Sequence, residues 1–368
     1  MDKKILITGG AGFIASNLLH YFVKKYPEYQ WINFDALTYA GNLENLKEIE
    51  NEPNYTFFKG DIRNSEDVVT VFQNFGITDV MHLAAESHVD RSMVNPTLFV
   101  ETNVMGTINL LNAAREYWKE DYSKHRFINF STDEIYGHLT SPEEPAFNEN
   151  TPLAPRSPYA TSKAAQTMFG YTYFNAYGVP VINTSCGNII GPYQFPEKLV
   201  PLTIDRLIHK EKIPVYGKGE QRRDWTAVAD VCKAVDIIFN KGKVGEMYCI
   251  GGDGECSNIE MIEAIIKAMV DIWYEEEKKH RRWIVNPKPL RENVYKALIN
   301  FIPDPRGNAH DFRYDIDHSK LTNELGWKPE YTFEKNVRET VQWYLDNQEW
   351  VEHCKSGEYK NWIKEYYK

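Results

Sequence analysis

The sequence lacks the features of membrane-spanning, secreted and nucleic-acid-binding proteins. Among its 368 residues, no run approaches the roughly 20 apolar residues that a membrane-spanning helix requires. The first charged residues lead directly into a short apolar run, without the hydrophobic region or cleavage site of a signal peptide. The net charge of -10 offers no basic face for phosphate contacts along a nucleic acid. We therefore expect a cytoplasmic protein that binds neither nucleic acid nor membrane.

Paired cysteines are also missing. The five cysteines form no Cys-x-x-Cys pair and no Cys/His spacing typical of a zinc site, so we expect no bound metal. Their odd number is typical of reduced thiols in a cytosol. Repeats and low-complexity tracts are absent, and 42% hydrophobic residues with 26% charged ones are ordinary for a globular protein of roughly two domains.

Short β-like runs alternate with longer helical segments through the first half of the chain. This alternation predicts a doubly wound parallel sheet with helices on its faces, a Rossmann-type α/β fold. Ligands of such sheets bind at the carboxyl ends of the strands. The expected strands are 4–8, 31–35, 55–59, 80–83, 126–131 and 180–186, and the expected helices are 13–25, 65–75, 97–117 and 158–177.

A glycine-rich loop joins the first expected strand to the first expected helix. Gly9 permits a tight turn, and Gly12 lets a pyrophosphate approach the helix N-terminus, where unpaired N–H groups attract anions. Such a pattern alone can be an ordinary turn, but here Asp35 follows at the end of the second strand. Its carboxylate would accept hydrogen bonds from ribose hydroxyls and repel a 2′-phosphate. The sequence therefore predicts a site for NAD rather than NADP.

The second half of the chain has longer loops, Pro- and Gly-rich turns and isolated helices. We expect residues 1–187 to form the NAD-binding domain, with a later segment at about 226–252 returning to it. Residues 188–368 would then form mainly a smaller, mixed α/β substrate domain. Within it, the charged stretch 271–301 is interpreted as a solvated helix and loop rather than a binding segment.

Tyr159 and Lys163 place a phenol and an ammonium one helical turn apart. Lys163 would lower the pKa of the phenol so that it can take a proton from a substrate hydroxyl. This pair is distinguished by Ser157 as the expected N-cap, Pro158 as the first helical residue, and Thr132 at a strand end. A surface helix or strand is the preferred explanation of the same spacing at Tyr21/Lys25, Tyr55/Lys59, Tyr274/Lys278 and Tyr331/Lys335.

Two acids, Asp133 and Glu134, directly follow Thr132. Adjacent acids usually belong to a solvated turn or a helix N-terminus, and in isolation we would prefer that explanation. At a strand end beside a cofactor they can divide acid and base work instead. One would protonate a leaving hydroxyl while the other removes a carbon-bound proton.

Together these motifs resemble the extended short-chain dehydrogenase/reductases, and among them the dTDP-glucose 4,6-dehydratases. The resemblance covers almost the whole chain. Its most specific part is the Thr132-Asp133-Glu134 triplet, since sugar-nucleotide 4-epimerases of this fold generally lack the acid pair. The matching segments are 8–14 (TGGAGFI), Asp35 with 37–43 (LTYAGNL), 84–92 (AAESHVDRS), 131–137 (STDEIYG), Tyr159 with Lys163, 191–199 (GPYQFPEKL) and 223–225 (RDW).

The resemblance implies an NAD-dependent lyase that dehydrates a nucleoside-diphosphate glucose, with dTDP-glucose as the preferred substrate. Tyr159, helped by Thr132 and Lys163, would deprotonate the C4 hydroxyl while hydride passes from C4 to NAD. Glu134 would then remove the C5 proton and Asp133 would protonate the C6 hydroxyl as water leaves. Return of the hydride to C6 would give a 4-keto-6-deoxy sugar and leave NAD tightly bound and recycled.

The resemblance also implies which residues bind each ligand. Those for NAD are Gly9, Gly12, Phe13, Ile14, Asp35, Leu37, Thr38, Asp61, Ile62, Leu83, Ala84, Ala85, Ser87, Thr102, Tyr159, Lys163 and Asn188. Those for the sugar nucleotide are Ser87, Thr132, Asn188, Lys198, Leu199, Pro214, Tyr216, Arg223, Asn258, Arg306 and His310. Arg223 suits this role physically, because its guanidinium is a fork-shaped donor for phosphate.

Several positions depart from the family pattern. Ala15 replaces the third glycine of the loop, and Ala36 replaces the lysine that often follows the ribose-binding acid. The family's Asn-Asn-Tyr-Gly is Asn188-Ile-Ile-Gly191 here, and its Arg-Pro-Gly-His-Asp corresponds only to residues 306–311. These last departures leave the nucleotide base open, so the same reaction on UDP-glucose is an alternative.

Two further alternatives concern the activity itself. A 4-epimerase is disfavoured by the acid pair, and a non-catalytic NAD-binding scaffold has no need of Thr132, Tyr159 and Lys163 together. The helices expected at 97–117 and 158–177 match those through which relatives pair, so we expect a homodimer. Packing on the sheet would explain an apolar face there equally well.

Overall fold

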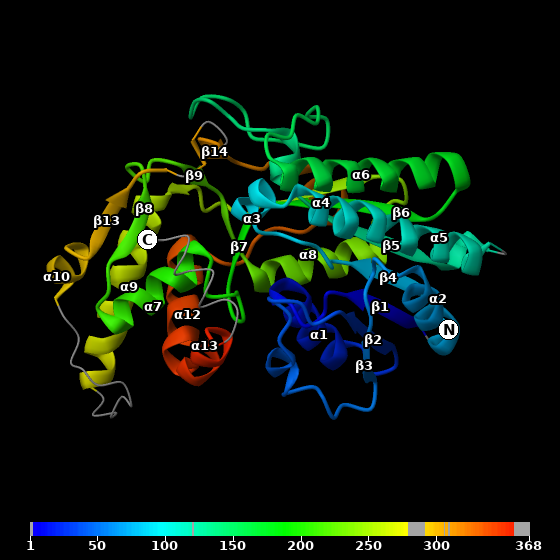
Figure 1. Cartoon of the computed structure of the whole chain (residues 1–368), viewed down its shortest axis with the longest axis horizontal. Helices are drawn as coiled ribbons and strands as arrows, with labels where there is room; N and C mark the ends of the chain where they lie inside the picture. Colours follow the sequence, from blue (N-terminus) through cyan, green and yellow to red (C-terminus); the bar gives the residue numbers. More distant parts are fainter. Residues whose placement is uncertain (1–2, 120, 279–290, 305, 308–309, 357–368) are drawn as a thin grey trace.

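A seven-stranded parallel sheet forms the centre of the molecule in the computed structural model, which describes residues 3–119, 121–278, 291–304, 306–307 and 310–356 (Figure 1). The strand order is β11-β6-β5-β4-β1-β2-β3, so the winding direction reverses between β1 and β4. This order confirms the predicted Rossmann-type fold. The strands are β1 Lys4–Thr8, β2 Gln30–Asp35, β3 Tyr55–Lys59, β4 Asp79–His82, β5 Arg126–Thr132, β6 Val181–Cys186 and β11 Met247–Ile250.

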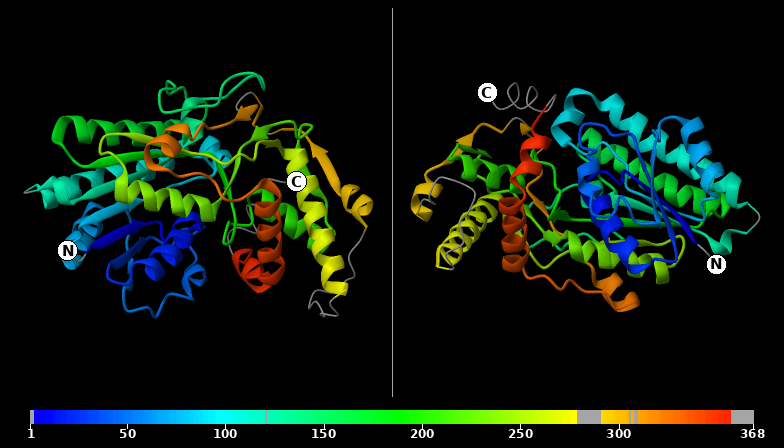
Figure 2. Two further views of the ribbon diagram at one scale, coloured as in Figure 1. Left: turned by 180° about the vertical axis from the view of Figure 1, so that it is seen from behind. Right: turned by 90° about the horizontal axis from the view of Figure 1, so that it is seen from below.

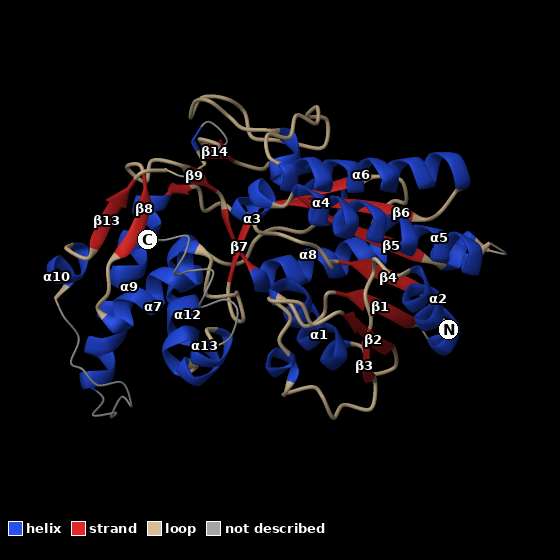
Figure 3. Ribbon diagram, in the orientation of Figure 1, coloured by secondary structure: helices blue, strands red, loops and turns tan. Residues whose placement is uncertain are grey.

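Helices cover both faces of this sheet (Figure 3). Because successive side chains of a strand point to opposite faces, Ile5 and Ile7 of β1 pack with α1 Phe13–Lys25 and α8 Val228–Lys241. Leu6, between them, packs with α2 Ser65–Phe75 and α5 Gly106–Trp118 on the other face. Burial on both faces explains why the strands are almost continuously apolar.

The helix expected at 97–117 is interrupted by a segment of π-helix. The structure has α4 Pro96–Phe99, the π segment Val100–Met105, and then α5. Within the π segment, Asn103 bonds through its side-chain amide to both backbone polar groups of Glu86, at 2.8 and 2.9 Å, and to Ser162 Oγ at 2.9 Å. These bonds compensate for the altered winding, and π segments of this kind occur often at functional sites.

The elements that form the C-terminal core stand to one side of the sheet in both views of Figure 2. Helix α11 Ser319–Leu325 instead packs with α8 and β11 of the central sheet. No helix among the described residues is long and apolar enough to cross a membrane. The further elements are α3 Val89–Val94, α6 Pro158–Tyr177, β7 Asn188–Ile190, α7 Leu199–His209, β8 Ile213–Tyr216, β9 Arg222–Arg223, β10 Trp225–Ala227, β12 Cys256–Ser257, α9 Asn258–Lys278, α10 Glu292–Lys296, β13 Ile299–Ile302, β14 Arg313–Tyr314, α11 Ser319–Leu325, α12 Phe333–Asp346 and α13 Gln348–Cys354.

One segment expected to return to the sheet and one expected to be solvated can be compared with the structure. After α8, β11 pairs in parallel with β6 at the edge of the central sheet, within the segment expected to return to it. The stretch 271–301 is only partly the solvated helix and loop that we expected. Ile272 and Trp273 are buried in the C-terminal core, because α9 is amphipathic, and β13 pairs with β8. Residues 279–290 of this stretch lie outside the described part of the chain.

Candidate active site

Two adjoining cavities of about 440 and 380 Å³ lie at the carboxyl ends of the central strands. They share lining residues from three separate elements, among them Phe13, Leu83, Ser87 and Lys198. The larger cavity lies beside the glycine loop and β4, at the point where the strand order reverses. The cavities therefore form one cleft at the place where Rossmann-type folds bind their ligands.

The glycine loop has the geometry of an anion site. Gly9 has a φ of +71°, and a Cβ added there would lie 2.8 Å from Ala84 Cα, so this position requires glycine. Gly12 is the N-cap of α1 and provides no side-chain acceptor for the first N–H groups of the helix. Those N–H groups and the absence of Cβ atoms fit a pyrophosphate at this edge of the larger cavity.

Asp35 is held in place by the backbone beside this loop. Its Oδ2 accepts from Ala11 N at 2.9 Å, and its Oδ1 accepts from Leu37 N at 2.7 Å. Leu37 itself adopts a φ of +54°. The carboxylate is only 7% exposed and lines the larger cavity, so it is positioned to meet ribose hydroxyls.

All but one of the residues predicted for NAD line the cleft. Leu37 lines neither cavity; its contribution is the backbone bond to Asp35. Tyr159, Lys163 and Asn188 line the smaller cavity. The larger cavity brings together Gly9, Gly12, Phe13, Ile14, Asp35, Thr38, Asp61, Ile62, Leu83, Ala84, Ala85, Ser87 and Thr102.

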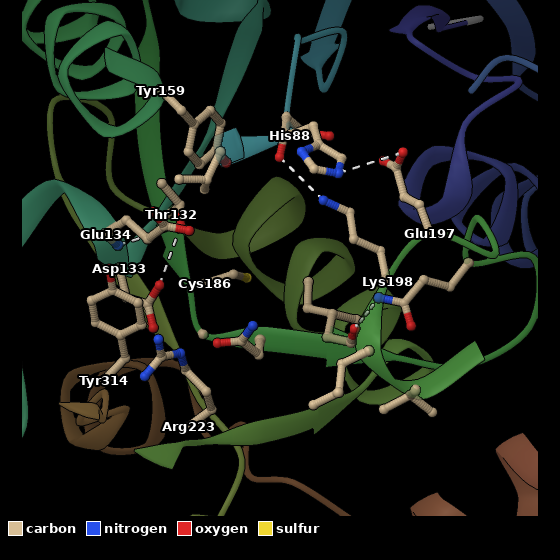
Figure 4. A pocket seen from close by; sticks show the side chains of 18 of the residues that line it. His88, Thr132, Asp133, Glu134, Tyr159, Cys186, Glu197, Lys198, Arg223 and Tyr314 are labelled. Atoms are coloured by element: carbon tan, nitrogen blue, oxygen red, sulfur yellow. Dashed lines mark hydrogen bonds and ion pairs between the residues drawn. The ribbon is translucent and has the colours of Figure 1, made fainter. Parts of the chain in front are cut away.

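The acid pair stands where β5 ends and a short 3₁₀ turn, Asp133–Tyr136, begins. Thr132 caps the turn: its Oγ1 accepts from Glu134 N at 3.4 Å and donates to Asp133 Oδ1 at 3.2 Å (Figure 4). The cap turns both carboxyl groups into the smaller cavity rather than into solvent. We predicted that the acid pair faces the cofactor site because it follows a strand end, although two adjacent acids alone usually belong to a solvated turn; in the structure the turn faces the cleft.

Burial separates the acid and base properties of the two carboxyl groups. Asp133 is 2% exposed, and burial together with the charge of Glu134 raises its pKa to about 8. Burial also raises the pKa of Glu134, but the positive charges of Arg306 and Arg223 oppose that rise. The raised pKa of Asp133 therefore favours its protonated form, which can act as an acid, while the two arginines favour the charged form of Glu134, which can act as a base.

Helix α6 carries Tyr159 in its first turn. Ser157 Oγ accepts from Ala160 N at 3.1 Å, and Pro158 is the first helical residue, which confirms both predicted start signals. Tyr159 is 9% exposed and lines the smaller cavity with Thr132 and the acid pair. Burial and the charge of Glu134 raise the pKa of Tyr159, whereas its interaction with Thr132 lowers it.

Every residue predicted for the sugar nucleotide lines the smaller cavity: Ser87, Thr132, Asn188, Lys198, Leu199, Pro214, Tyr216, Arg223, Asn258, Arg306 and His310. Lys198 Nζ donates to Ser87 O at 3.2 Å. The Arg223 guanidinium lies over the Tyr314 ring at 4.2 Å and donates to Asp311 O at 3.0 Å. Arg306 forms an ion pair with Asp90. The cavity thus places several cations opposite the acid pair, as a diphosphate-linked substrate requires.

Some lining residues were not predicted. Glu197 is 5% exposed, accepts from Tyr39 Oη at 3.2 Å, and lies 3.6 Å from His88 Nε2. Both Glu197 and His88 belong to motif segments, so the motifs contained a signal that we did not assign. Tyr314, under Arg223, has no local sequence signal, because it reaches the cleft from the two-residue strand β14, which pairs with β9.

Comparison with known proteins places this cleft in a family. Residues 6–340 match the GDP-mannose 4,6 dehydratase family. The dTDP-glucose 4,6-dehydratase of Salmonella typhimurium is 43% identical, with 99% of each chain covered. The structure of dTDP-glucose 4,6-dehydratase from Bacillus anthracis in complex with NAD superposes with a TM-score of 0.81 at 42% identity and covers 96% of this chain and 100% of its own.

The structure of DesIV, a dTDP-glucose 4,6-dehydratase from Streptomyces venezuelae with NAD bound, gives a TM-score of 0.83 at 35% identity. The match covers 96% of this chain and 100% of that chain. These likenesses extend over the sheet, the cleft and the C-terminal elements. The chain therefore belongs to the dTDP-glucose 4,6-dehydratase family.

Proposed function

We propose that this protein is an NAD-dependent lyase that converts dTDP-glucose to dTDP-4-keto-6-deoxyglucose. The observation that carries the proposal is the pair Asp133-Glu134 in one cavity with Tyr159, with carboxyl groups of different proton affinity. An oxidation at C4 alone would need only Tyr159. The acid pair adds what an elimination needs, a base for one carbon and an acid for the neighbouring leaving group. Relatives named for this activity support the assignment.

The glycine loop, Asp35 and the residues of the larger cavity would hold NAD. When bound, NAD supplies an acceptor that takes hydride from C4 and returns it at C6, so it is not consumed. Gly9 and Gly12 would admit the pyrophosphate and Asp35 would accept from the adenosine ribose. No nearby cation is available at Ala36 or Leu37 to compensate the charge of a 2′-phosphate.

Tyr159 would take the proton of the C4 hydroxyl. Burial and the charge of Glu134 hold the pKa of this phenol above its ordinary value. Thr132 favours the phenolate by hydrogen bonding, and the Lys163 ammonium favours it electrostatically. Tyr159 can therefore act as a base when the Lys163 ammonium and the Thr132 hydroxyl stabilise its phenolate.

The C4 ketone then acidifies the proton on C5. Glu134 would remove that proton, and Asp133, whose raised pKa favours its protonated form, would deliver its own proton to the departing C6 hydroxyl. Thr132 holds the Asp133 carboxyl group and the backbone N–H of Glu134, so it fixes the turn that carries both acids at the end of β5. Glu134 would finally return a proton to C5.

The cations of the smaller cavity would bind the diphosphate. Arg223, held by backbone carbonyls and the Tyr314 ring, has a fixed direction, whereas Arg306 and Lys198 would exchange their present partners for phosphate oxygens. Asn258 and Tyr216 would lie toward the nucleotide. Of the two candidate nucleobases, thymine and uracil, the named relatives favour thymine.

We further propose the division into an NAD-binding domain, 1–187 with about 226–252, and a substrate domain formed mainly by the rest. A homodimer is supported by exposed apolar side chains on α3, the π segment and α6, among them Met93, Val94, Val100, Met105 and Met168. Monomeric proteins rarely expose so many apolar side chains together. The cytoplasmic location expected from the composition stays a prediction.

Incubation of the purified protein with dTDP-glucose, UDP-glucose and UDP-galactose in heavy water tests the proposal. We expect a 4-keto-6-deoxy sugar from dTDP-glucose, with deuterium at C5, since Glu134 exchanges its proton with solvent before returning it. NMR of the products reads both features. Interconversion of the two UDP-sugars would indicate a 4-epimerase, and bound NAD without any turnover would indicate a scaffold.

A further inference from the structure

A buried glutamine holds the ammonium of Lys163. Gln166, on α6 three residues after Lys163, has no exposed surface. Its Oε1 accepts from Lys163 Nζ at 2.6 Å, and Phe130 O accepts from the same ammonium at 2.6 Å. Two of the three N–H donors of Lys163 are therefore fixed, which leaves one for the cavity that Lys163 lines.

The hydrogen-bond network fixes which end of the Gln166 amide faces Lys163. Asn129 Nδ2 donates to the backbone oxygen of Gln166 at 3.2 Å and to Asn183 Oδ1 at 2.8 Å. This orientation leaves Asn129 Oδ1 as an acceptor, and Gln166 Nε2 donates to it at 2.6 Å. Gln166 Oε1 must then face Lys163, because the nitrogen end of the amide is already used.

Close packing of α6 on the sheet keeps this network in place. One turn after Gln166, a Cβ added to Gly170 would lie 2.4 Å from Asn183 Oδ1 and 3.0 Å from Asn129 Nδ2. The missing side chain lets the helix approach the two asparagines of β5 and β6. The network thus connects Lys163 to two central strands through side chains that cannot shift far.

The ammonium needs such acceptors because its surroundings disfavour charge. Lys163 is 4% exposed, and burial lowers its pKa to about 7. His82 in β4 interacts with it but is neutral, because burial holds the His82 pKa at about 3. The titratable groups that line the same cavity include Tyr159 on α6, the acid pair after β5, Cys186 on β6 and Arg223 on β9. An acceptor bonded directly to the ammonium is the contact that favours its charged form.

We propose that Gln166 is a positioning residue for Lys163, which keeps the ammonium protonated and directs its remaining N–H toward the cofactor and Tyr159. The inference rests on the proposed function, since it assigns Gln166 a part in the proton transfer from the C4 hydroxyl. It differs from a purely structural role in one measurable respect. A structural residue would affect folding, whereas Gln166 should also set the proton affinity of Lys163.

The direct test is Gln166→Met, which keeps the length of the side chain and removes the acceptor. The protein is labelled with ¹³Cε lysine and titrated by NMR as purified, and Lys163→Met identifies the Lys163 signal. We expect the titration midpoint of Lys163 to fall by about one pH unit. Thr167→Val is the matched control: it removes a buried hydroxyl that bonds Ser131 Oγ at 2.9 Å on the same helix turn, and it should leave the midpoint unchanged.

Turnover of dTDP-glucose gives the second readout. At pH 7 the Met variant should lose about fivefold in kcat with little change in KM, since a midpoint one unit below about 7 leaves roughly a tenth of Lys163 protonated instead of half. The pH above which its activity declines should likewise be lower than that of the natural protein. An unchanged Lys163 midpoint, with kcat equal to that of Thr167→Val, would overturn the inference and leave the proposed function intact. Absence of dehydration in the natural protein would overturn the proposed function, and the NMR titration would still decide the inference.

If the Met variant fails to fold, Gln166→Glu tests the same contact, because it should shift the Lys163 titration midpoint in the opposite direction. Its carboxylate would be an ionised acceptor for Lys163, so the midpoint should rise by about one pH unit or more. A midpoint that stays at the natural value would contradict the proposal.

Discussion

Replacement of Glu134 by Gln is expected to lower the dehydration rate by at least about 100-fold, because positioned general bases contribute roughly 10²–10⁴ in rate. The amide has nearly the same shape as the carboxylate but cannot accept the C5 proton. The first proton transfer, by Tyr159, should survive. Turnover measured with dTDP-glucose should therefore fall, while acid quenching followed by borodeuteride reduction should trap a nucleotide-linked 4-keto-glucose on the protein.

The same variant carries a second consequence for Asp133. The charge of Glu134 contributes to raising the Asp133 pKa to about 8, so its removal should lower that pKa. Glu143→Gln makes the same chemical change at an exposed position outside the cleft and should behave as the natural protein. Full dehydration activity in Glu134→Gln would rule out the assignment of Glu134 as the base.

Tyr159→Phe is expected to stop the reaction earlier, with a loss of about 1000-fold in rate. The ring still fills the space beside Thr132, but no oxygen remains to take the C4 proton. Neither the dehydrated product nor the 4-keto-glucose intermediate should then form. The same quench and reduction that trap the intermediate in Glu134→Gln should find only dTDP-glucose in this variant.

Tyr173→Phe is the matched control for that change. Tyr173 lies on the same helix, is also buried, and donates from its phenol to Asn112 Oδ1 at 2.7 Å, away from the cleft. Loss of this hydrogen bond should lower the free energy of unfolding by about 1 kcal/mol and leave the turnover of dTDP-glucose unchanged. Trapped 4-keto-glucose in Tyr159→Phe would show that another group takes the C4 proton.

The parts of the fold set by local sequence were predictable. The helices at 13–25, 65–75 and 158–177 begin and end where the sequence placed them. For the last two, a side-chain cap marks the start and a left-handed glycine marks the end. The acid pair, Tyr159 and Lys163 were found because each adjoins a strand end or a helix start. Their gathering in one cavity follows from the parallel sheet, whose carboxyl ends meet at one edge.

What the sequence could not predict depends on contacts between distant segments. The π segment at 100–105 is sustained by bonds from Asn103 to Glu86 and Ser162, and neither partner is near it in sequence. Tyr314 and Gln166 carry no motif. Gln166 becomes informative only when Asn129 and Asn183 fix its amide, and this requires three elements to pack together.

The fate of the hydrogen on C4 shows whether one hydride leaves and returns within a single turnover. dTDP-glucose deuterated at C4 is converted in ordinary water, and the product is examined by mass spectrometry and NMR. If NAD returns the hydride that it takes from C4, the C6 methyl group of the 4-keto-6-deoxy product contains one deuterium. Deuterium lost to solvent, or retained at C4 of an epimerised sugar, would contradict it.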